Sequence, residues 1–201
     1  MTTATLNSPV KQRMTVEEFL DFCDRPENED KLFELLRGEV IEVPPPMPLH
    51  GVVCSNIATE LTLHARLRRK GHVATNDSAV RFADDSVLGP DVAYFEHIDK
   101  YRDLGPRPAE TPPTLAVEVL SPSDSFRKVS KKIERYLSAG VKMVWLVDPE
   151  EETISVYRPN EQWKVFSADQ QLVGDPELPG FSHRVANFFL LPGELPVAEA
   201  T

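Results

Sequence analysis

The sequence predicts an α/β protein with a mixed β-sheet flanked by helices, on the strength of three observations. Over residues 50–70 apolar side chains recur every three or four positions, which is the period of an amphipathic helix. The runs TLAVEVL and VKMVWLVD are almost wholly apolar, as is typical of strands in a sheet covered on both faces. A helical segment over residues 124–139 separates these runs, so together they form a strand–helix–strand crossover unit.

The first expected elements are a short helix and a hairpin. Thr15 is a typical N-cap and the acidic residues Glu17 and Glu18 follow it, so the segment VEEFLDFC is expected to be helical. Next, KLFELLRGEVIEVPPP holds two extended apolar runs on either side of Arg37-Gly38, which predicts a β-hairpin. The prolines that follow cannot lie in the centre of a sheet, so they end the hairpin.

The long helix is expected to run from His50 to Lys70, and Gly71 is placed to end it. Beyond it the pattern changes to strands, namely HVATNDSAVRF, DVAYF and TLAVEVL, separated by turns rich in glycine and proline. Gly140 ends the crossover helix before VKMVWLVD, and TISVY and QWKVF are then expected to pair as a hairpin. Residues 178–191 mix turn residues with apolar anchors.

Length and charge favour one acidic domain. A chain of 201 residues can bury one substantial core, and we expect a single domain over residues 15–192 between flexible segments at 1–14 and 193–201. Lys and Arg number 22 against 32 Asp and Glu, so the formal net charge is −10, the wrong sign for a protein that coats nucleic acid. A nucleic-acid role would therefore need local basic patches and a divalent metal.

Cysteine usage and hydropathy favour a soluble cytoplasmic protein. Cys23 and Cys54 are the two cysteines of the sequence and lack CxxC spacing, so they predict neither a disulfide framework nor a zinc cluster. The first residues lack the apolar region of a signal peptide, and no stretch approaches the roughly 18 apolar residues of a membrane span. We therefore expect a reducing compartment and no membrane association.

Two carboxylates stand in apolar strand contexts. Glu118 lies inside TLAVEVL, where an ionised carboxylate is costly to bury unless a cation or metal compensates it. The alternative is that Glu118 points to a solvated face together with Ala116 and Leu120, which the period of two puts on the same side. Asp91 follows Pro90 at the head of DVAYF, although such a pair also marks ordinary turns. On neighbouring strand ends, the two carboxylates can share a divalent ion such as Mg²⁺.

Helical geometry singles out Lys132. At about 100° per residue, the helix over residues 124–139 carries one apolar stripe. Its members are Phe126, Val129, Ile133, Tyr136 and Leu137. Lys131 falls opposite this stripe and is expected in solvent, whereas Lys132 falls on its border, where a long side chain can reach inward. The alternative for Lys132 is an ordinary solvent-facing charge on a helix.

The remaining candidates are His50, which begins the long helix, and Glu34 in the first hairpin. A histidine before a helix is also a common cap or surface residue, so a functional role and a structural role both stay open for His50. Two basic clusters could contact phosphate, or could simply be solvated helix faces. They consist of Arg66, Arg68, Arg69 and Lys70, and of Arg127, Lys128, Lys131, Lys132 and Arg135.

Five segments together resemble a known family. FELLRGEVIEVPPP with His50, then GPDVAYF, LAVEVLSPSD, KIERYLSAGVKMVWLVDP and LPGFSHRVANFF follow one another over residues 15–191. In this order and spacing they resemble the restriction endonuclease-like (Uma-type) family of the PD-(D/E)XK nuclease superfamily. The resemblance implies a restriction endonuclease-like fold, with a metal at the open end of the central strands.

The resemblance also implies roles for single residues. Pro90-Asp91 matches the PD of the motif and Glu118 matches its acidic position, but Leu120 stands where the textual motif has lysine. In this branch the lysine is expected on the next helix, where the KIERY segment points to Lys132. His50 and Glu34 fall where the branch has supporting residues near the metal.

The implied activity is metal-dependent hydrolysis of DNA phosphodiester bonds. Asp91, Glu118 and the backbone carbonyl of Val119 would hold Mg²⁺ or Mn²⁺, and Lys132 would orient the attacking water or stabilise developing charge. DNA binding is expected to be weak and salt-sensitive. A homodimer is expected because duplex cleavage needs two cuts, with an apolar tail around Phe188 and Phe189 as its surface.

Three other functions stay open for such a fold. The first is a catalytically weak or inactive binding or regulatory module, because a fold does not guarantee a function. The second is a metal-dependent hydrolase of a small phosphorylated molecule. The third is a purely structural subunit, which would bind no metal.

Overall fold

The computed structural model describes residues 13–99, 103–122 and 124–196 of the chain. Its helices are α1 (Val16–Cys23), α2 (Pro48–Arg68) and α4 (Phe126–Ser138), with 3₁₀ turns η1 (Pro26–Asn28) and η2 (Val185–Phe188). The strands up to the crossover helix are β1 (Leu32–Leu36), β2 (Glu39–Val43), β3 (His72–Thr75), β4 (Val80–Ala83), β5 (Ser86–Leu88), β6 (Val92–Phe95) and β7 (Leu115–Val119). Those after it are β8 (Met143–Asp148), β9 (Thr153–Tyr157), β10 (Lys164–Ser167), β11 (Gln171–Val173) and β12 (Ser182–Arg184).

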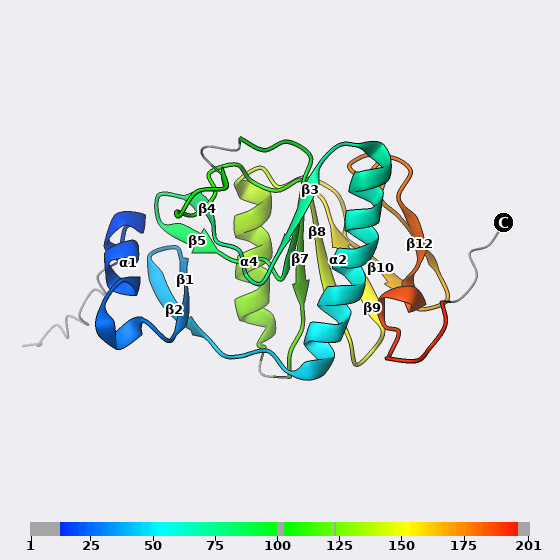
Figure 1. The fold of residues 1–201 in the computed structure, drawn as a ribbon, viewed down its shortest axis with the longest axis horizontal. Coiled ribbons are helices and arrows are strands. Elements are labelled where there is room, and N and C mark those ends of the chain that lie inside the picture. Colours follow the sequence, from blue (N-terminus) through cyan, green and yellow to red (C-terminus); the bar gives the residue numbers. More distant parts are fainter. Residues whose placement is uncertain (1–12, 100–102, 123, 197–201) are drawn as a thin grey trace, which may run out of the picture.

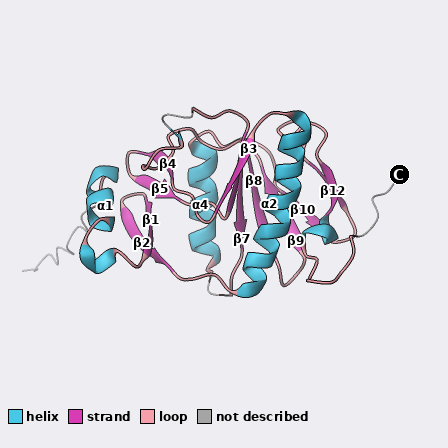
Figure 2. Cartoon of the chain, in the orientation of Figure 1, coloured by secondary structure: helices cyan, strands magenta, loops and turns pink. Residues whose placement is uncertain are grey.

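The predicted α/β fold with mixed sheets and flanking helices is confirmed (Figures 1 and 2). A six-stranded sheet has the order β10-β9-β8-β7-β6-β3, and a four-stranded sheet has the order β2-β1-β5-β4. The pair β7–β8 is parallel because α4 crosses over between them, and the other neighbours in both sheets are antiparallel. Figure 1 shows α1 and the β1–β2 hairpin at one end of the molecule and β12 at the other.

The first helix and hairpin form as predicted. Thr15 Oγ1 accepts from Glu18 N at 3.3 Å while Glu18 Oε2 accepts from Thr15 N at 2.9 Å, which is a complete capping box. Between β1 and β2, Arg37 and Gly38 have φ of 53° and 76°, the positive values that a tight two-residue hairpin turn requires. The turn therefore sets the register that carries Glu34 to the inner side of β1.

The long helix differs from its prediction at both ends. It begins at Pro48 rather than His50, because the first helical position needs no N–H and the fixed φ of proline suits it. It ends at Arg68, and Arg69 takes the left-handed conformation with φ of 52° that was expected of a glycine. His50 and Cys54 thus lie in the first two turns of α2, one helical turn apart.

The single strand predicted over residues 72–82 is wrong. Asn76 and Asp77 both have positive φ, 59° and 52°, and this reversal splits the run into two strands. Strand β3 joins the six-stranded sheet, whereas β4 joins the four-stranded sheet. Asparagine and aspartate tolerate this conformation better than most residues, so the NDS segment acts as a turn.

Helices α2 and α4 cover opposite faces of the six-stranded sheet. Val53, Ile57 and Leu61 of α2 belong to one core cluster with the odd-numbered residues of β7. On the opposite face, α4 packs in a second cluster that also includes residues of the four-stranded sheet. Because side chains of a strand alternate, Glu118 lies on the face that α4 covers, and the solvated face considered for it is excluded.

The predicted apolar stripe of α4 is confirmed in its centre, but the prediction is wrong at the start of the helix. Val129, Ile133 and Tyr136 are buried against the sheets, and Lys132 is buried beside them. Phe126, by contrast, is 83% exposed, since it is the first residue of the helix and lies beside an open groove also lined by Trp163. The stripe of α4 therefore meets the core from Val129 onward.

The apolar tail predicted as a dimer surface is buried instead. Phe188 and Phe189 belong to the core cluster that contains α2, and the side chain of Asn56 donates to the backbone carbonyls of Phe188 and Leu190, at 3.1 and 2.9 Å. These two hydrogen bonds hold the segment against α2, so it cannot supply an exposed interface. Most of the flexible segments predicted at 1–14 and 193–201 lies outside the described residues.

Within the described ranges, no helix combines the length and the apolar character needed to cross a membrane.

Candidate functional site

Strands β6 and β7 bring the two predicted carboxylates together. These strands are antiparallel with Val92 opposite Val117, and continuing this register by one residue sets Asp91 opposite Glu118. Directly opposed residues have Cβ atoms about 4.5–5.5 Å apart. Asp91 is further fixed because its Oδ2 accepts from the backbone N–H of Val119 at 2.6 Å. The pairing predicted from the sequence is thus a consequence of strand register.

Glu118 is surrounded by hydrogen-bond donors from α4. Lys132 Nζ lies 2.6 Å from Glu118 Oε2 and 3.0 Å from Glu34 Oε1, so one ammonium bridges two carboxylates. The hydroxyl of Tyr136 donates to Glu118 Oε1. Glu34 also accepts from the backbone N–H of Gly89 at 3.0 Å. Glu34, Glu118 and Lys132 are only 5%, 8% and 9% exposed, so these contacts are made largely out of water.

The pKa values of this group follow from burial and crowding of like charges. Burial raises the pKa of Glu118 to about 8; Lys132 opposes this rise, whereas Asp91 and Glu34 add to it. For Lys132, burial favours the neutral amine, but Glu118 and Glu34 outweigh it and the pKa is raised. The pKa of Tyr136 is raised well above its usual value by burial and by Glu118, so its hydroxyl remains a donor. Lys132 is therefore a permanent cation.

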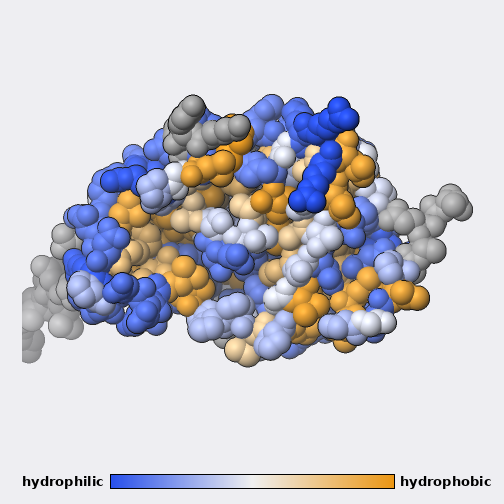
Figure 3. Space-filling view, viewed as in Figure 1, coloured by the Kyte–Doolittle hydropathy of each residue, from blue (hydrophilic) through white to orange (hydrophobic). Residues whose placement is uncertain are grey.

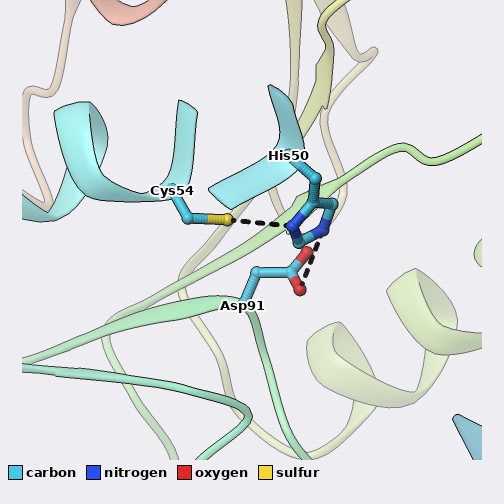
Figure 4. Close-up of side chains that lie close together, drawn as sticks. All are labelled: His50, Cys54 and Asp91. Carbon is cyan, nitrogen blue, oxygen red and sulfur yellow. Dashed lines mark hydrogen bonds and ion pairs between the residues drawn. The ribbon is translucent and has the colours of Figure 1, made fainter. Parts of the chain in front are cut away.

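Asp91 has a second set of neighbours on α2 (Figure 4). His50 Nε2 lies 3.3 Å from Asp91 Oδ1, and His50 Nδ1 lies 3.5 Å from the Sγ of Cys54. The hydrogen bond with Asp91 and the contact with Cys54 raise the pKa of His50 to about 10, against the effect of burial. Burial raises the pKa of the Cys54 thiol, and His50 partly offsets this.

Asp77 is a further carboxylate at the site. It belongs to the turn between β3 and β4, and its pKa is raised to about 6, first by burial and then by the negative charge of Asp91. Lys132 and His50 act in the opposite direction. The loop that breaks the predicted strand therefore delivers an acidic side chain to the site.

Apart from Cys54 and Tyr136, the side chains of the site line a cavity of about 450 Å³. Among the described residues around it, five carboxylates face two lysines and one histidine. They are Glu34, Asp77, Asp91, Glu118 and Asp124 against Lys128, Lys132 and His50. An excess of carboxylate oxygens around a cavity matches the ligand preference of a hard divalent cation such as Mg²⁺ or Mn²⁺. The donor set thus fits the metal expected from the sequence.

A longer groove of about 590 Å³ continues from the cavity along α2. His50, Asp77 and Asp91 line both spaces, and the hydroxyl residues Ser55, Thr59 and Thr62 lead from them toward the C-terminal end of the helix. The groove reaches Arg66 there. It offers a surface of mixed polar and apolar side chains that opens directly onto the carboxylates.

The fold places some residues of each predicted basic cluster in ion pairs and others along the groove or the cavity. Strongly hydrophilic residues gather over the C-terminal end of α2 in Figure 3, but Lys70 pairs with Glu96 at 2.8 Å and Arg68 lies 4.0 Å from the same carboxylate. In the second cluster, Arg135 pairs with Asp85 at 3.1 Å. Arg66 lines the groove, while Lys128 and Lys132 line the cavity.

All five candidate side chains from the sequence lie at one site, while the site roles of three further residues, Cys54, Asp77 and Tyr136, were missed. Cys54 was dismissed for lack of CxxC spacing, yet it stands four residues after His50 on a predicted helix, a spacing that puts both side chains on one face. No sequence pattern pointed to Asp77, because the segment HVATNDSAVRF that contains it was interpreted as one strand. The convergence of Tyr136 on Glu118 was hidden by its place in an apolar stripe.

Comparisons with known proteins agree with the predicted family and fold. The model of the family Uma2, described as "Putative restriction endonuclease", matches residues 16–190. Among solved structures, one described as a putative nuclease belonging to DUF820 from Anabaena variabilis has 27% sequence identity and a TM-score of 0.74. The match covers 88% of this chain and 97% of that one. No match was found among curated proteins.

Proposed function

The chain belongs to the Uma2 family of restriction endonuclease-like proteins, and on that premise we propose that it is a divalent-metal-dependent endonuclease that hydrolyses DNA phosphodiester bonds. One observation carries the proposal: Asp91 and Glu118 lie opposite each other on neighbouring strands and face a cavity together with the buried ammonium of Lys132. Paired acidic oxygens with an adjacent fixed cation suit the transfer of a phosphoryl group to water.

The proposed metal ligands are Asp91, Glu118 and the backbone carbonyl of Val119. When bound there, Mg²⁺ or Mn²⁺ would polarise the scissile phosphate and lower the pKa of a coordinated water. The backbone N–H of Val119 holds one oxygen of Asp91, which leaves the other oriented toward the cavity side where His50 lies. This arrangement restrains the carboxylate before a ligand arrives.

Lys132 is the proposed catalytic cation. Its raised pKa keeps it charged, so it can orient the attacking water or stabilise the charge that develops on the phosphate. Glu34 holds the ammonium from the side opposite Glu118, and is itself held by the backbone N–H of Gly89. Glu34 and His50 are therefore proposed as positioning residues, acting through Lys132 and Asp91 respectively.

DNA is the proposed substrate, bound weakly. The net charge of −10 repels a polyanion at long range, so productive binding would rely on the metal, on Lys128 and Lys132, and on the groove that ends at Arg66. Affinity that depends on a few phosphate contacts falls steeply with salt. The groove along α2 supports a strand path that leads to the carboxylates.

The test is metal-dependent nicking of supercoiled plasmid at low salt. Wild type with Mg²⁺ or Mn²⁺ is expected to nick the plasmid, whereas Asp91→Ala, Glu118→Gln and Lys132→Ala lose at least about a hundredfold in rate. Lys131→Ala is the matched control, since Lys131 neighbours Lys132 on α4 but does not line the cavity. Equal activity in wild type and Asp91→Ala would overturn the proposal.

A nuclease-fold binding module without turnover is the second candidate. Both oxygens of Glu118 already accept hydrogen bonds, from Lys132 and from Tyr136, which would weaken this carboxylate as a metal ligand. Such a module would bind DNA in a filter or anisotropy assay and leave it uncut with every divalent metal. Binding unaffected by Asp91→Ala would favour it further.

A further inference from the structure

His50, Cys54 and Asp91 form a compact group that lines the groove along α2 (Figure 4). Each is half-buried, and one ligand atom from each lies within 4.8 Å of the others. His50 and Cys54 stand one turn apart on α2, so the helix holds the imidazole and the thiol on one face. Asp91 approaches from the head of β6. The backbone therefore sets the spacing of all three donors.

The ligand atoms of this group differ from those of the carboxylates that line the cavity. Nitrogen, sulfur and oxygen together are the ligands of zinc in proteins, whereas Mg²⁺ takes oxygen and avoids thiolate. We propose that His50, Cys54 and Asp91 form a Zn²⁺ site that is separate from the Mg²⁺ position but shares Asp91 with it. Because the backbone N–H of Val119 already engages Asp91 Oδ2, both ions would compete for Asp91 Oδ1, and Zn²⁺ would inhibit the enzyme by taking it.

The geometry requires only a modest movement of side chains. Zinc stands about 2.0–2.1 Å from nitrogen and about 2.3 Å from sulfur, so its ligands lie roughly 3.5 Å apart. The contact of Cys54 with His50 already has this length, 3.5 Å, and that of Asp91 with His50 is 3.3 Å. These contacts use opposite nitrogens of the ring, so the imidazole must turn for one nitrogen to meet the ion. The proton on that nitrogen and the thiol proton of Cys54 then leave to solvent. The adjoining groove leaves a fourth position for water.

The backbone N–H of Val119 supports this site as well. It engages Asp91 Oδ2 at 2.6 Å and leaves Oδ1 toward His50. A ligand held in this way by an outer hydrogen bond binds metal more tightly than a free one. Cys54 has no part in the proposed Mg²⁺ site, so its removal separates the two functions.

The site is tested directly with Co²⁺ as a spectroscopic probe of the full chain. Wild type is expected to bind one Co²⁺ with a thiolate-to-metal charge-transfer band, and Zn²⁺ should abolish that band. Cys54→Ser and Cys54→Ala should lose it, while Cys23→Ser, at the half-buried cysteine of α1, should keep it. Absence of the band in wild type, or its persistence in both Cys54 variants, would overturn the inference.

The inhibitory effect rests on the proposed nuclease function and is tested in the plasmid assay. With Mg²⁺ in excess, Zn²⁺ should inhibit wild type and Cys23→Ser alike, and half-inhibition of Cys54→Ser should need at least about tenfold more Zn²⁺. Equal inhibition of Cys54→Ser and wild type contradicts the inference even if nicking is normal. If wild type does not cut at all, the nuclease proposal fails, whereas the Co²⁺ titration still decides the site.

Discussion

At the scale of single residues, Lys132 is the side chain on which the candidate site depends. It is the cation that bridges Glu118 and Glu34, and all three are almost fully buried. A buried ion pair contributes little net stability compared with apolar residues, but removing one partner leaves an uncompensated charge in a medium of low dielectric constant. Removing the ammonium of Lys132 should therefore lower the free energy of unfolding as well as the proposed activity.

We expect Lys132→Met to lower the free energy of unfolding by about 3–5 kcal/mol, because Glu118 and Glu34 lose their common partner. Urea unfolding at neutral pH measures this change. The double variant Lys132→Met/Glu34→Gln should recover part of the loss, since the carboxylate of Glu34 that Lys132 held is then a neutral amide. A double variant less stable than the single one would show that the loss has another origin, such as altered packing of α4.

Asp77 gives a pH-dependent prediction whose sign follows from its raised pKa. In the folded protein the pKa is about 6, above the ordinary 3.8, so the native state holds the proton more tightly than the unfolded chain. The contribution of Asp77 to stability therefore falls as pH rises from about 4 to about 6, and stays unfavourable above that. Replacing the carboxylate removes this penalty.

Asp77→Asn should accordingly stabilise the protein at pH 7 by on the order of 1 kcal/mol after allowance for solvent screening, and should give no gain near pH 4. Asparagine also tolerates the positive φ of this position, 52°. The difference in unfolding free energy between variant and wild type, measured across this pH range, checks the prediction. A difference that does not vary with pH would count against it.

At the scale of elements, the turn that enters β6 does more than reverse the chain. Gly89 lies so close to the backbone of Asp77 that a Cβ there would overlap it, and its N–H donates to Glu34. Pro90 then starts the strand at Asp91. One short segment thus couples the Asp77 turn, the Glu34 strand and the start of the strand after Asp91, which explains why a glycine stands at that point.

Gly89→Ala should therefore destabilise the protein by about 1–3 kcal/mol, because the backbone of Asp77 must move. Gly51→Ala is the contrasting variant: nothing lies within 4 Å of its added Cβ, and alanine in α2 should stabilise by about 0.5–1 kcal/mol. Chemical denaturation of both variants checks the pair. Equally small changes in both variants would mean that the backbone of Asp77 moves at little cost in free energy.

At the scale of the whole molecule, the site forms only where separate layers meet. Glu34 comes from the four-stranded sheet, Asp91 and Glu118 from the six-stranded sheet, Lys132 from α4 between them, and His50 from α2. Local unfolding of any layer would disperse these charges. The free energy that packs the layers therefore also assembles the carboxylates against their mutual repulsion.

The C-terminal segment belongs to this packing rather than to an interface. Phe188→Ala should lower the free energy of unfolding by about 3–5 kcal/mol, because Phe188 is fully buried beside Trp145 and Phe181. Phe126→Ala, at an exposed ring, should change it by less than about 0.5 kcal/mol. Sedimentation of both variants checks the oligomeric state as well. The homodimer stays a prediction, and a change of assembly in Phe188→Ala without loss of stability would restore the tail as its surface.

Most of the local structure could be predicted because its signals are local. The capping box at Thr15, the Arg37-Gly38 turn and the period of α4 depend on residues within one or two turns of each other. The same reasoning identified Glu118 and Lys132, since a charge inside an apolar run or on the border of an apolar stripe must find a partner. Confirmation of the family and fold follows from the same segments.

What the sequence by itself determined is therefore most of the segments that form strands or helices, together with the centre of the inward-facing stripe of α4. Only the tertiary structure decided that the chain breaks at Asn76-Asp77, that Phe188 is buried, and that Cys54 and Asp77 join Asp91. Periodicity specifies a face but not the surface that it meets. The meeting of loops and helix ends depends on contacts between segments far apart in the chain, and no local pattern encodes those contacts.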